Sequence, residues 1–162
     1  MSKRLFLADK TVGRLARWLR LLGFDCAMQP DNDILRLLVR CRAEGRVLLT
    51  KNTALAAAAA PDECLLIAFD RIRQQLKQVM KYYNLTIDKE NILTICSVCN
   101  ERLDDVAPAE VRGIAPPFVF ATQTVFRRCP RCRRIYWAGT HKTRMLAWLD
   151  ETLDNPTTSG PN

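Results

Sequence analysis

The sequence predicts an α/β protein with a parallel sheet covered by helices on both faces, followed by a small cysteine-containing module and a C-terminal helix. Short apolar runs alternate with helical patterns over the first half of the chain, which is typical of a parallel sheet with helical crossovers. Two Cys-x-x-Cys pairs then follow at 96–99 and 129–132. A chain of 162 residues is long enough for one ordinary domain and a small additional module.

Strands and helices are expected to alternate from the N-terminus. Apolar runs predict strands at 4–9, 24–29, 46–50 and 64–69. Amphipathic or alanine-rich segments predict helices at 12–22, 31–45, 53–60, 71–83 and 142–153. Gly23 and Gly45 end the first two helices, and Asp31 or Asp33 is the N-cap of the second.

The composition limits the compartment and the class of partner. No apolar run is long enough to cross a membrane, and the first ten residues lack the apolar core of a secretory signal. Seven cysteines, an odd number, suit a reducing compartment, so we expect a cytoplasmic protein. The net charge of +8 favours a polyanionic partner, with nucleic acid first, although a basic surface kept for solubility is the alternative.

Four of the cysteines have the spacing of a metal site. Two Cys-x-x-Cys turns deliver two thiolates each, and together they supply the four tetrahedral ligands of a structural zinc ion. The ligands are Cys96, Cys99, Cys129 and Cys132. Because all four positions are filled by protein, this zinc ribbon is expected to be structural and not catalytic. The alternative is two redox pairs.

The second cysteine pair is surrounded by basic and aromatic residues. They are Arg127, Arg128, Arg131, Arg133, Arg134, Tyr136 and Trp137. Arginines beside aromatic rings suit a phosphate backbone with stacked bases, so these residues are candidates for nucleic-acid binding. Alternatively, the two rings pack in the core of the ribbon.

Acidic side chains follow three of the four predicted strands. They are Asp9, Asp31, Asp33 and Asp70, and the remaining strand is followed by Asn52. The carboxyl ends of parallel strands meet at one edge of a sheet, where ligands bind. Oxygen ligands gathered there suit Mg²⁺ or Mn²⁺, which can activate water for attack on a phosphodiester. Singly, the acids that follow the second and fourth strands are equally compatible with helix caps.

Several motifs together resemble the Mut-seven C-terminal ribonuclease family. They are FLADKTVGRLARWLRLLGFD near the N-terminus, RVLLTKN in the middle, and CSVC, CPRC and RIYWAGTH toward the C-terminus. The resemblance covers about residues 4–150 and implies a PIN-like nuclease domain, metal-dependent and acting on RNA, with a zinc ribbon appended. It implies metal-site roles for Asp9 and for Asp33 or Asp31. Asn52 stands where members typically show the aspartate of Thr-Arg-Asp, so one acid is replaced by an amide.

We therefore expect a PIN-like nuclease domain at 1–88, a zinc ribbon with the C-terminal helix at 89–153, and a disordered tail at 154–162. The leading hypothesis is a metal-dependent ribonuclease in which the rim acids hold Mg²⁺ or Mn²⁺. Arg14 and Arg17, on the helix after Asp9, would hold phosphates, or would form a solvated basic face. The alternative is a non-catalytic RNA- or ribosome-binding module with a degenerate nuclease site. A DNA-binding zinc-ribbon protein is a third, weaker interpretation.

Overall fold

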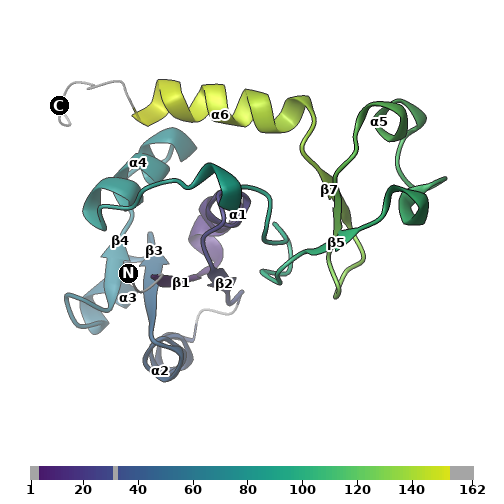
Figure 1. Cartoon of the computed structure of the whole chain (residues 1–162). Helices are drawn as coiled ribbons and strands as arrows, with labels where there is room; N and C mark the ends of the chain where they lie inside the picture. Colours follow the sequence, from purple (N-terminus) through teal and green to yellow (C-terminus); the bar gives the residue numbers. More distant parts are fainter. Residues whose placement is uncertain (1–3, 31–32, 154–162) are drawn as a thin grey trace.

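The four predicted strands form one parallel sheet. The structure is a computed structural model that describes residues 4–30 and 33–153. The strands lie in the order β2-β1-β3-β4, and every neighbouring pair is parallel (Figure 1). They are β1 (Leu5–Ala8), β2 (Cys26–Met28), β3 (Arg46–Thr50) and β4 (Cys64–Leu66). The α/β prediction is therefore confirmed, and the carboxyl ends of β1 and β3 are neighbours at the centre of the sheet.

Helices cover both faces of this sheet. The alternation of side chains along β1 sends Phe6 and Ala8 to one face and Leu7 to the other. The first face packs against α1 (Gly13–Leu21) and α4 (Ile72–Tyr82), and the second packs against α2 (Ile34–Glu44) and α3 (Thr53–Ala58). The two apolar clusters are separated by the sheet, as expected for strands that are buried on both sides.

The second half of the chain contains a small antiparallel sheet. Its strands are β5 (Asp104–Val106), β6 (Phe126–Arg128) and β7 (Ile135–Trp137), with β6 in the middle. The stretch between the two cysteine pairs is more than a plain loop. It contains β5, the 3-10 helix η3 (Pro108–Val111) and the short helix α5 (Pro117–Thr122). Val111, Ala115 and Phe126 form a small separate core under these elements.

The C-terminal helix α6 (Thr140–Leu153) returns to the first domain, where it lies along α4 (Figure 1). Its residues Met145 and Leu149 are buried in the same apolar cluster as α1 and α4. Trp148 stacks on Trp18 of α1, with a distance of 4.3 Å between the ring centroids. The division of the chain at residue 88 stays a prediction, but α6 contributes its apolar face to the core of the parallel-sheet domain.

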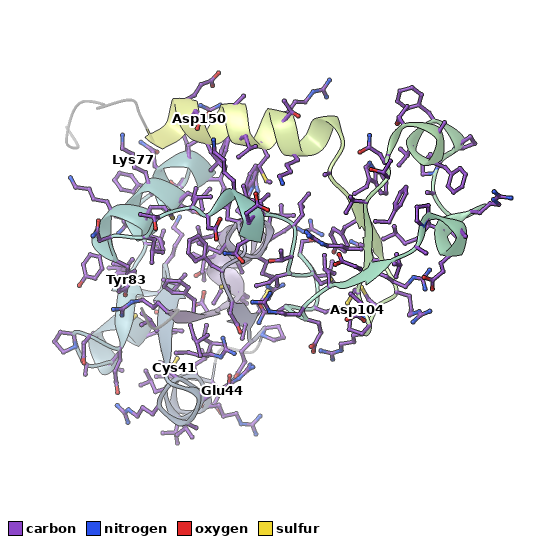
Figure 2. The ribbon with its side chains drawn as sticks, viewed as in Figure 1. Cys41, Glu44, Lys77, Tyr83, Asp104 and Asp150 are labelled. Atoms are coloured by element: carbon purple, nitrogen blue, oxygen red, sulfur yellow. The ribbon has the colours of Figure 1, made fainter. Side chains whose placement is uncertain are left out.

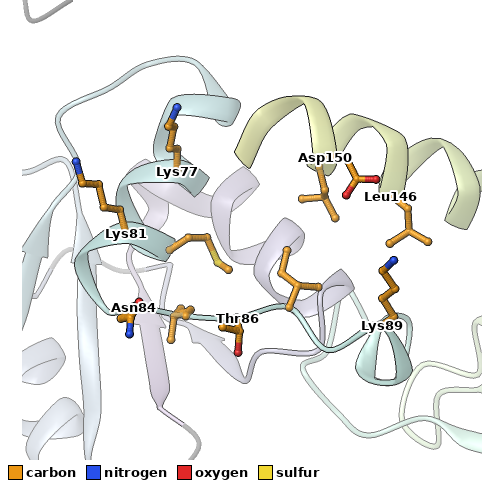
Figure 3. Close-up of a pocket in the computed structure, with 11 residues that line it drawn as sticks. Lys77, Lys81, Asn84, Thr86, Lys89, Leu146 and Asp150 are labelled. Carbon is orange, nitrogen blue, oxygen red and sulfur yellow. The ribbon is translucent and has the colours of Figure 1, made fainter. Parts of the chain in front are cut away.

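The contact between α6 and α4 is incomplete at one place. A pocket of about 480 Å³ lies between α4, the segment 84–89 and α6 (Figure 3). Its lining combines apolar side chains with lysines, including Lys81 and Lys89. Figure 2 shows Lys77 of α4 on the side of that helix that approaches Asp150 of α6.

The structure shortens several predicted elements. Asp9 caps the 3-10 helix η1 (Lys10–Val12), which precedes the first helix. Strands β2 and β4 are short and lie at the two edges of the sheet. Gly23 ends the first helix, as predicted, with a φ of +84°. A Cβ at this position would lie 2.3 Å from the carbonyl oxygen of Asn91, so only glycine lets the chain of η2 (Lys89–Asn91) approach. Asp31 and the expected tail at 154–162 lie outside the described residues.

Candidate active site and metal centre

The four predicted zinc ligands come together. The sulfur atoms of the four cysteines all lie within 4.8 Å of one another, and those of Cys96 and Cys132 are 3.7 Å apart. In each pair the backbone N–H of the second cysteine donates to the sulfur of the first, at 3.4 Å for both Cys99 and Cys132. Four thiols from two turns are the donor set of a closed, structural zinc site, and the geometry is consistent with one.

The two cysteine turns have the same backbone structure. Asn100 and Arg133, the residues that follow each pair, have φ angles of 63° and 62°. Their N–H groups donate to the carbonyl oxygens of Cys96 and Cys129, at 3.0 and 2.9 Å. Asparagine adopts this left-handed conformation more readily than most residues. We refer to the turn at 96–100 as the first knuckle and to the turn at 129–133 as the second.

Tyr136 supports the metal centre from β7. Its hydroxyl lies 3.1 Å from Sγ of Cys96 and 3.2 Å from both the backbone N and Oγ of Ser97. Burial opposes ionisation of Cys96, but hydrogen bonds from Tyr136 and from the backbone of Cys99 outweigh it and lower its pKa to about 6. Burial and the neighbouring thiols raise the pKa of Cys99 to about 12. Four thiolates this close together need a cation among them, and this donor set suits zinc.

The zinc ribbon and the parallel sheet are joined by a buried arginine. Arg20 of α1 is 5% exposed, and its Nε donates to the carbonyl oxygen of Cys26 at 2.7 Å. Its Nη1 donates to the carbonyl oxygens of Ser97 and Val98, at 3.0 and 2.8 Å, inside the first knuckle. Burial lowers the pKa of Arg20. The helix that follows Asp9 is thereby attached to the turn that presents two of the four clustered cysteines.

A second connection runs through Asn100. Its side-chain oxygen accepts from the backbone N–H of Cys26 at 2.9 Å, and its Nδ2 donates to Asp25 at 2.6 Å. Asp25 also pairs with Arg46 at 2.6 Å. The edge strand β2 is therefore covered at its N-terminal end by the first knuckle.

Asp9 lies at the carboxyl edge of the sheet, as predicted, and is 1% exposed. Its Oδ1 accepts hydrogen bonds from the backbone N and the hydroxyl of Thr11, at 2.9 and 2.5 Å, and its Oδ2 accepts one from Thr50, at 2.5 Å. The two hydroxyls in turn accept from the backbone N–H groups of Lys51 and Asn52, both at 2.9 Å. Two threonines thus connect the carboxylate of Asp9 to the loop between β3 and α3.

The other predicted rim residues have partners of their own. Asn52 is the N-cap of α3, and its Oδ1 accepts from the backbone N–H groups of Ala54 and Leu55, at 3.0 and 3.2 Å. Asp33 is the N-cap of α2 and pairs with Arg36. Asp70 is paired with Lys51, whose ammonium group lowers the pKa of this exposed carboxylate. Asp33 and Asp70 therefore act as the cap and ion-pair partners that are common at exposed sites.

The described part of the rim does not make a divalent-metal site by itself. Among the residues the structure describes, the four cysteines form the one group of three or more His, Cys, Asp or Glu side chains that are close enough to share an ion. The oxygen of Asn52 already accepts two hydrogen bonds. In the described part of the chain Asp9 therefore belongs to no group of three or more such ligands, and we assign no reaction step to Mg²⁺ or Mn²⁺.

The candidate RNA-binding residues divide into two groups. Arg14, Arg17, Arg131, Arg133 and Arg134 are exposed. In contrast, Arg127 is bonded to Asp105 and to the carbonyl of Leu93, and Arg128 is bonded to Glu110. Trp137 packs on the small core of the ribbon, which agrees with the alternative that the sequence left open for the two rings.

Sequence reasoning missed the residues that join these parts. Arg20 follows buried Ala16 by four residues, so both lie on the same face of the helix. This spacing predicts that the arginine is buried as well. Thr11 and Thr50 flank the ends of predicted elements, where a hydroxyl often bonds to a nearby carboxylate or backbone group. No pattern in the sequence indicates that Asn100 reaches β2.

The fold and the two sites define an α/β domain, with a buried acid at its carboxyl edge, joined to a four-cysteine ribbon. The chain belongs to the Mut7-C RNAse domain family, whose sequence model matches residues 4–149. The human protein described as an exonuclease mut-7 homolog is 32% identical over 99 residues, which are 58% of this chain and 11% of that protein. No solved structure matches the chain. Membership of the family implies nuclease activity on RNA. In the described part of the chain, no helix has the length and apolar character needed to cross a membrane.

Proposed function

We propose that this chain binds RNA and cleaves its phosphodiester bonds at the rim formed by Asp9 and the loop 50–52. The family match over residues 4–149 supports the reaction class. The observation that carries the location is the buried carboxylate of Asp9, held by three hydrogen bonds where β1 ends. Buried charges are costly unless hydrogen-bonded, and carboxylates at this edge of a parallel sheet are placed where ligands bind.

The zinc ribbon is proposed to hold the RNA strand beside this rim. Arg131, Arg133 and Arg134 are exposed on and after the second knuckle, and the net charge of the chain is +8. Arginines bind phosphate through charge-assisted hydrogen bonds. Arg14 and Arg17 extend the positive surface on α1, the helix that follows Asp9.

Mg²⁺ or Mn²⁺ is the cofactor that the resemblance implies, since such an ion would neutralise charge on a phosphodiester, although the described rim residues do not form its ligand set alone. The dependence on metal is a prediction for the assay. Asn52 caps helix α3 and Asp70 is paired with Lys51, so both already have partners within the protein. This favours a second candidate function, an RNA- or ribonucleoprotein-binding module without turnover. Both functions use the same basic surface and differ in whether Asp9 takes part in a reaction.

One assay separates the two functions. The purified chain is incubated with labelled single-stranded RNA in the presence of Mg²⁺, Mn²⁺ or no added divalent ion, and the products are resolved by length. The proposal expects cleavage that Asp9→Asn abolishes while RNA binding is kept. Arg102→Gln, an exposed change away from the rim, serves as the control. If wild-type protein binds RNA but never cleaves it, the binding module is the correct function.

A further inference from the structure

A polar groove lies between the edge strand β2 and the zinc ribbon. Its volume is about 540 Å³, in the range of pockets that hold small ligands, which suits a short stretch of a single strand and not a duplex. One wall is formed by the sheet domain and includes Met28, Arg40 and Arg46. The other wall is formed by the first knuckle together with Arg131 from the second. Neither domain makes this groove alone.

The groove carries an excess of positive charge. Four arginines line it, against the two acids Asp25 and Glu101. Arg46 is held by Asp25, and Arg40 makes an i,i+4 pair with Glu44. The hydrogen bonds of Arg20 go to carbonyl oxygens, which leave its charge without a hydrogen-bonded carboxylate. Arg131 is exposed on the ribbon side. Arg40 and Arg46 have Glu44 and Asp25 as partners, so the charge without a carboxylate partner comes from Arg20 on the sheet side and from Arg131 on the ribbon side.

One end of the groove lies next to strand β1, close to the candidate active site. Met28, which lines the groove, is the register partner of Ala8 in the parallel pairing of β1 with β2. Ala8 directly precedes Asp9. The side chain of Met28 also approaches Gly13 at the start of α1, where a Cβ would lie 3.3 Å from the methionine methyl group. The groove thus extends from Arg131 of the second knuckle to Met28, which is paired with the residue that precedes Asp9.

We propose that this groove binds the backbone of single-stranded RNA and leads it from the zinc ribbon to the Asp9 rim. Arg131 and Arg40 contact phosphates from opposite walls, and Met28 lies under the strand at the last step before the rim. That RNA is the substrate rests on the proposed function. The new elements are the route of the RNA through the groove and the preference for a single strand. Because Arg20 and Asn100 fix the first knuckle against β2, the two walls are held at a set separation before RNA arrives.

The test compares two double variants that lose the same charge. Arg40→Gln with Arg131→Gln removes one cation from each wall, and Arg112→Gln with Arg144→Gln removes two exposed cations elsewhere. Binding of the zinc-loaded full chain to a short fluorescent oligouridine with phosphorothioate linkages is measured against salt. The groove variant should bind about tenfold more weakly and lose about 1.4 from the slope of log K on log salt, since each phosphate contact on a single strand contributes about 0.7. The control should keep the wild-type slope.

A positional measurement accompanies this comparison. A benzophenone side chain replaces Met28 in the groove, or Tyr82 at the end of α4, which is exposed and outside the groove. Irradiation with the same oligouridine should cross-link RNA at position 28 and not at 82. Equal losses in the two double variants, or equal cross-linking at both positions, would overturn the groove while leaving RNA binding itself intact. No RNA binding by the wild-type chain would overturn the proposed function as well.

Discussion

Nη1 of Arg20 lies 3.0 Å from the carbonyl oxygen of Ser97, so a helix of the parallel-sheet domain is hydrogen-bonded to the turn that carries the first pair of clustered cysteines. The same guanidinium group also bonds to Val98 and to Cys26. A single buried side chain therefore joins α1, the edge strand β2 and the first knuckle. The stability of the sheet domain and that of the metal centre are expected to depend on each other.

Replacement of Arg20 tests this dependence. Arg20→Met keeps much of the side-chain volume but leaves three carbonyl oxygens without their donor, so the free energy of unfolding should fall by about 2 to 4 kcal/mol. Arg17→Met, an exposed change on the same helix, should alter it by less than about 0.5 kcal/mol. Urea unfolding of both variants provides the comparison, and equal stabilities would contradict the role given to Arg20.

Removal of the metal should affect both halves of the chain. One zinc ion per chain is expected after purification under reducing conditions. Chelation, or Cys129→Ser, should unfold the ribbon and should also speed amide exchange in α1, because the carbonyls bonded to Arg20 lose their fixed positions. Exchange in α3, which packs against β3 and β4, serves as the internal control. A reduced sample that contains no metal would refute the zinc site.

Tyr136→Phe separates metal binding from RNA binding. The hydroxyl of Tyr136 bonds to Cys96 and Ser97 inside the ribbon, and loss of such a partner typically weakens metal affinity by about 10- to 100-fold. A competition with a chromophoric chelator measures this change. RNA affinity of the zinc-loaded variant should stay at the wild-type level, and a large loss would indicate that the hydroxyl contacts RNA.

Asn52→Asp addresses the replaced acid at the rim. Aspartate caps a helix as well as asparagine does, and its charge lies near the positive end of α3, so the variant should be as stable as the parent or slightly more stable. The added carboxylate lies on the loop joined to Asp9, so Mn²⁺ should bind more tightly and cleavage should be at least as fast. Asn52→Ala, which loses the cap, should cost about 1 kcal/mol. Unchanged Mn²⁺ binding in Asn52→Asp would mean that this loop is not part of a metal site.

Asp25 gives the chain a pH dependence of known sign. Burial raises its pKa, but hydrogen bonds from Arg46 and Asn100 outweigh burial and hold it below the ordinary value. A carboxyl whose pKa is lowered by folding stabilises the protein above its unfolded pKa of about 3.9, and this contribution is lost as the pH falls further. Asp25→Asn should therefore reduce stability at neutral pH and flatten its decline in acid. Unfolding midpoints between about pH 3 and pH 6 will show whether the two curves converge.

Local patterns in the sequence predicted much of this structure. The strands and helices of the first domain follow from apolar periodicity, and the spacing of the four cysteines predicts a site that the structure assembles. The strand-end position of Asp9 likewise follows from the order of elements. These features depend on residues that are close in sequence or on a rule that holds for every parallel sheet.

The parts that were not predicted depend on contacts between distant segments. Arg20 meets Ser97 across 77 positions, and Asn100 meets Cys26 across 74. Its position after a strand suggests that the oxygen of Asn52 is available for a metal. In the structure this oxygen accepts hydrogen bonds from two backbone amides of α3. Polar side chains have several partners within reach, and only the packed fold selects among them.

The position of α6 has a consequence for synthesis of the protein. The apolar faces of α1 and α4 leave the ribosome long before Met145 and Leu149, which complete their core. In the interval the nascent chain has an incomplete apolar core, and the ribbon segment emerges between α4 and the last helix. Such surfaces attract chaperones and other nascent chains. Because the proposed zinc site lies between these helices in the chain, we expect zinc supply during translation to influence how much of this protein reaches its native state.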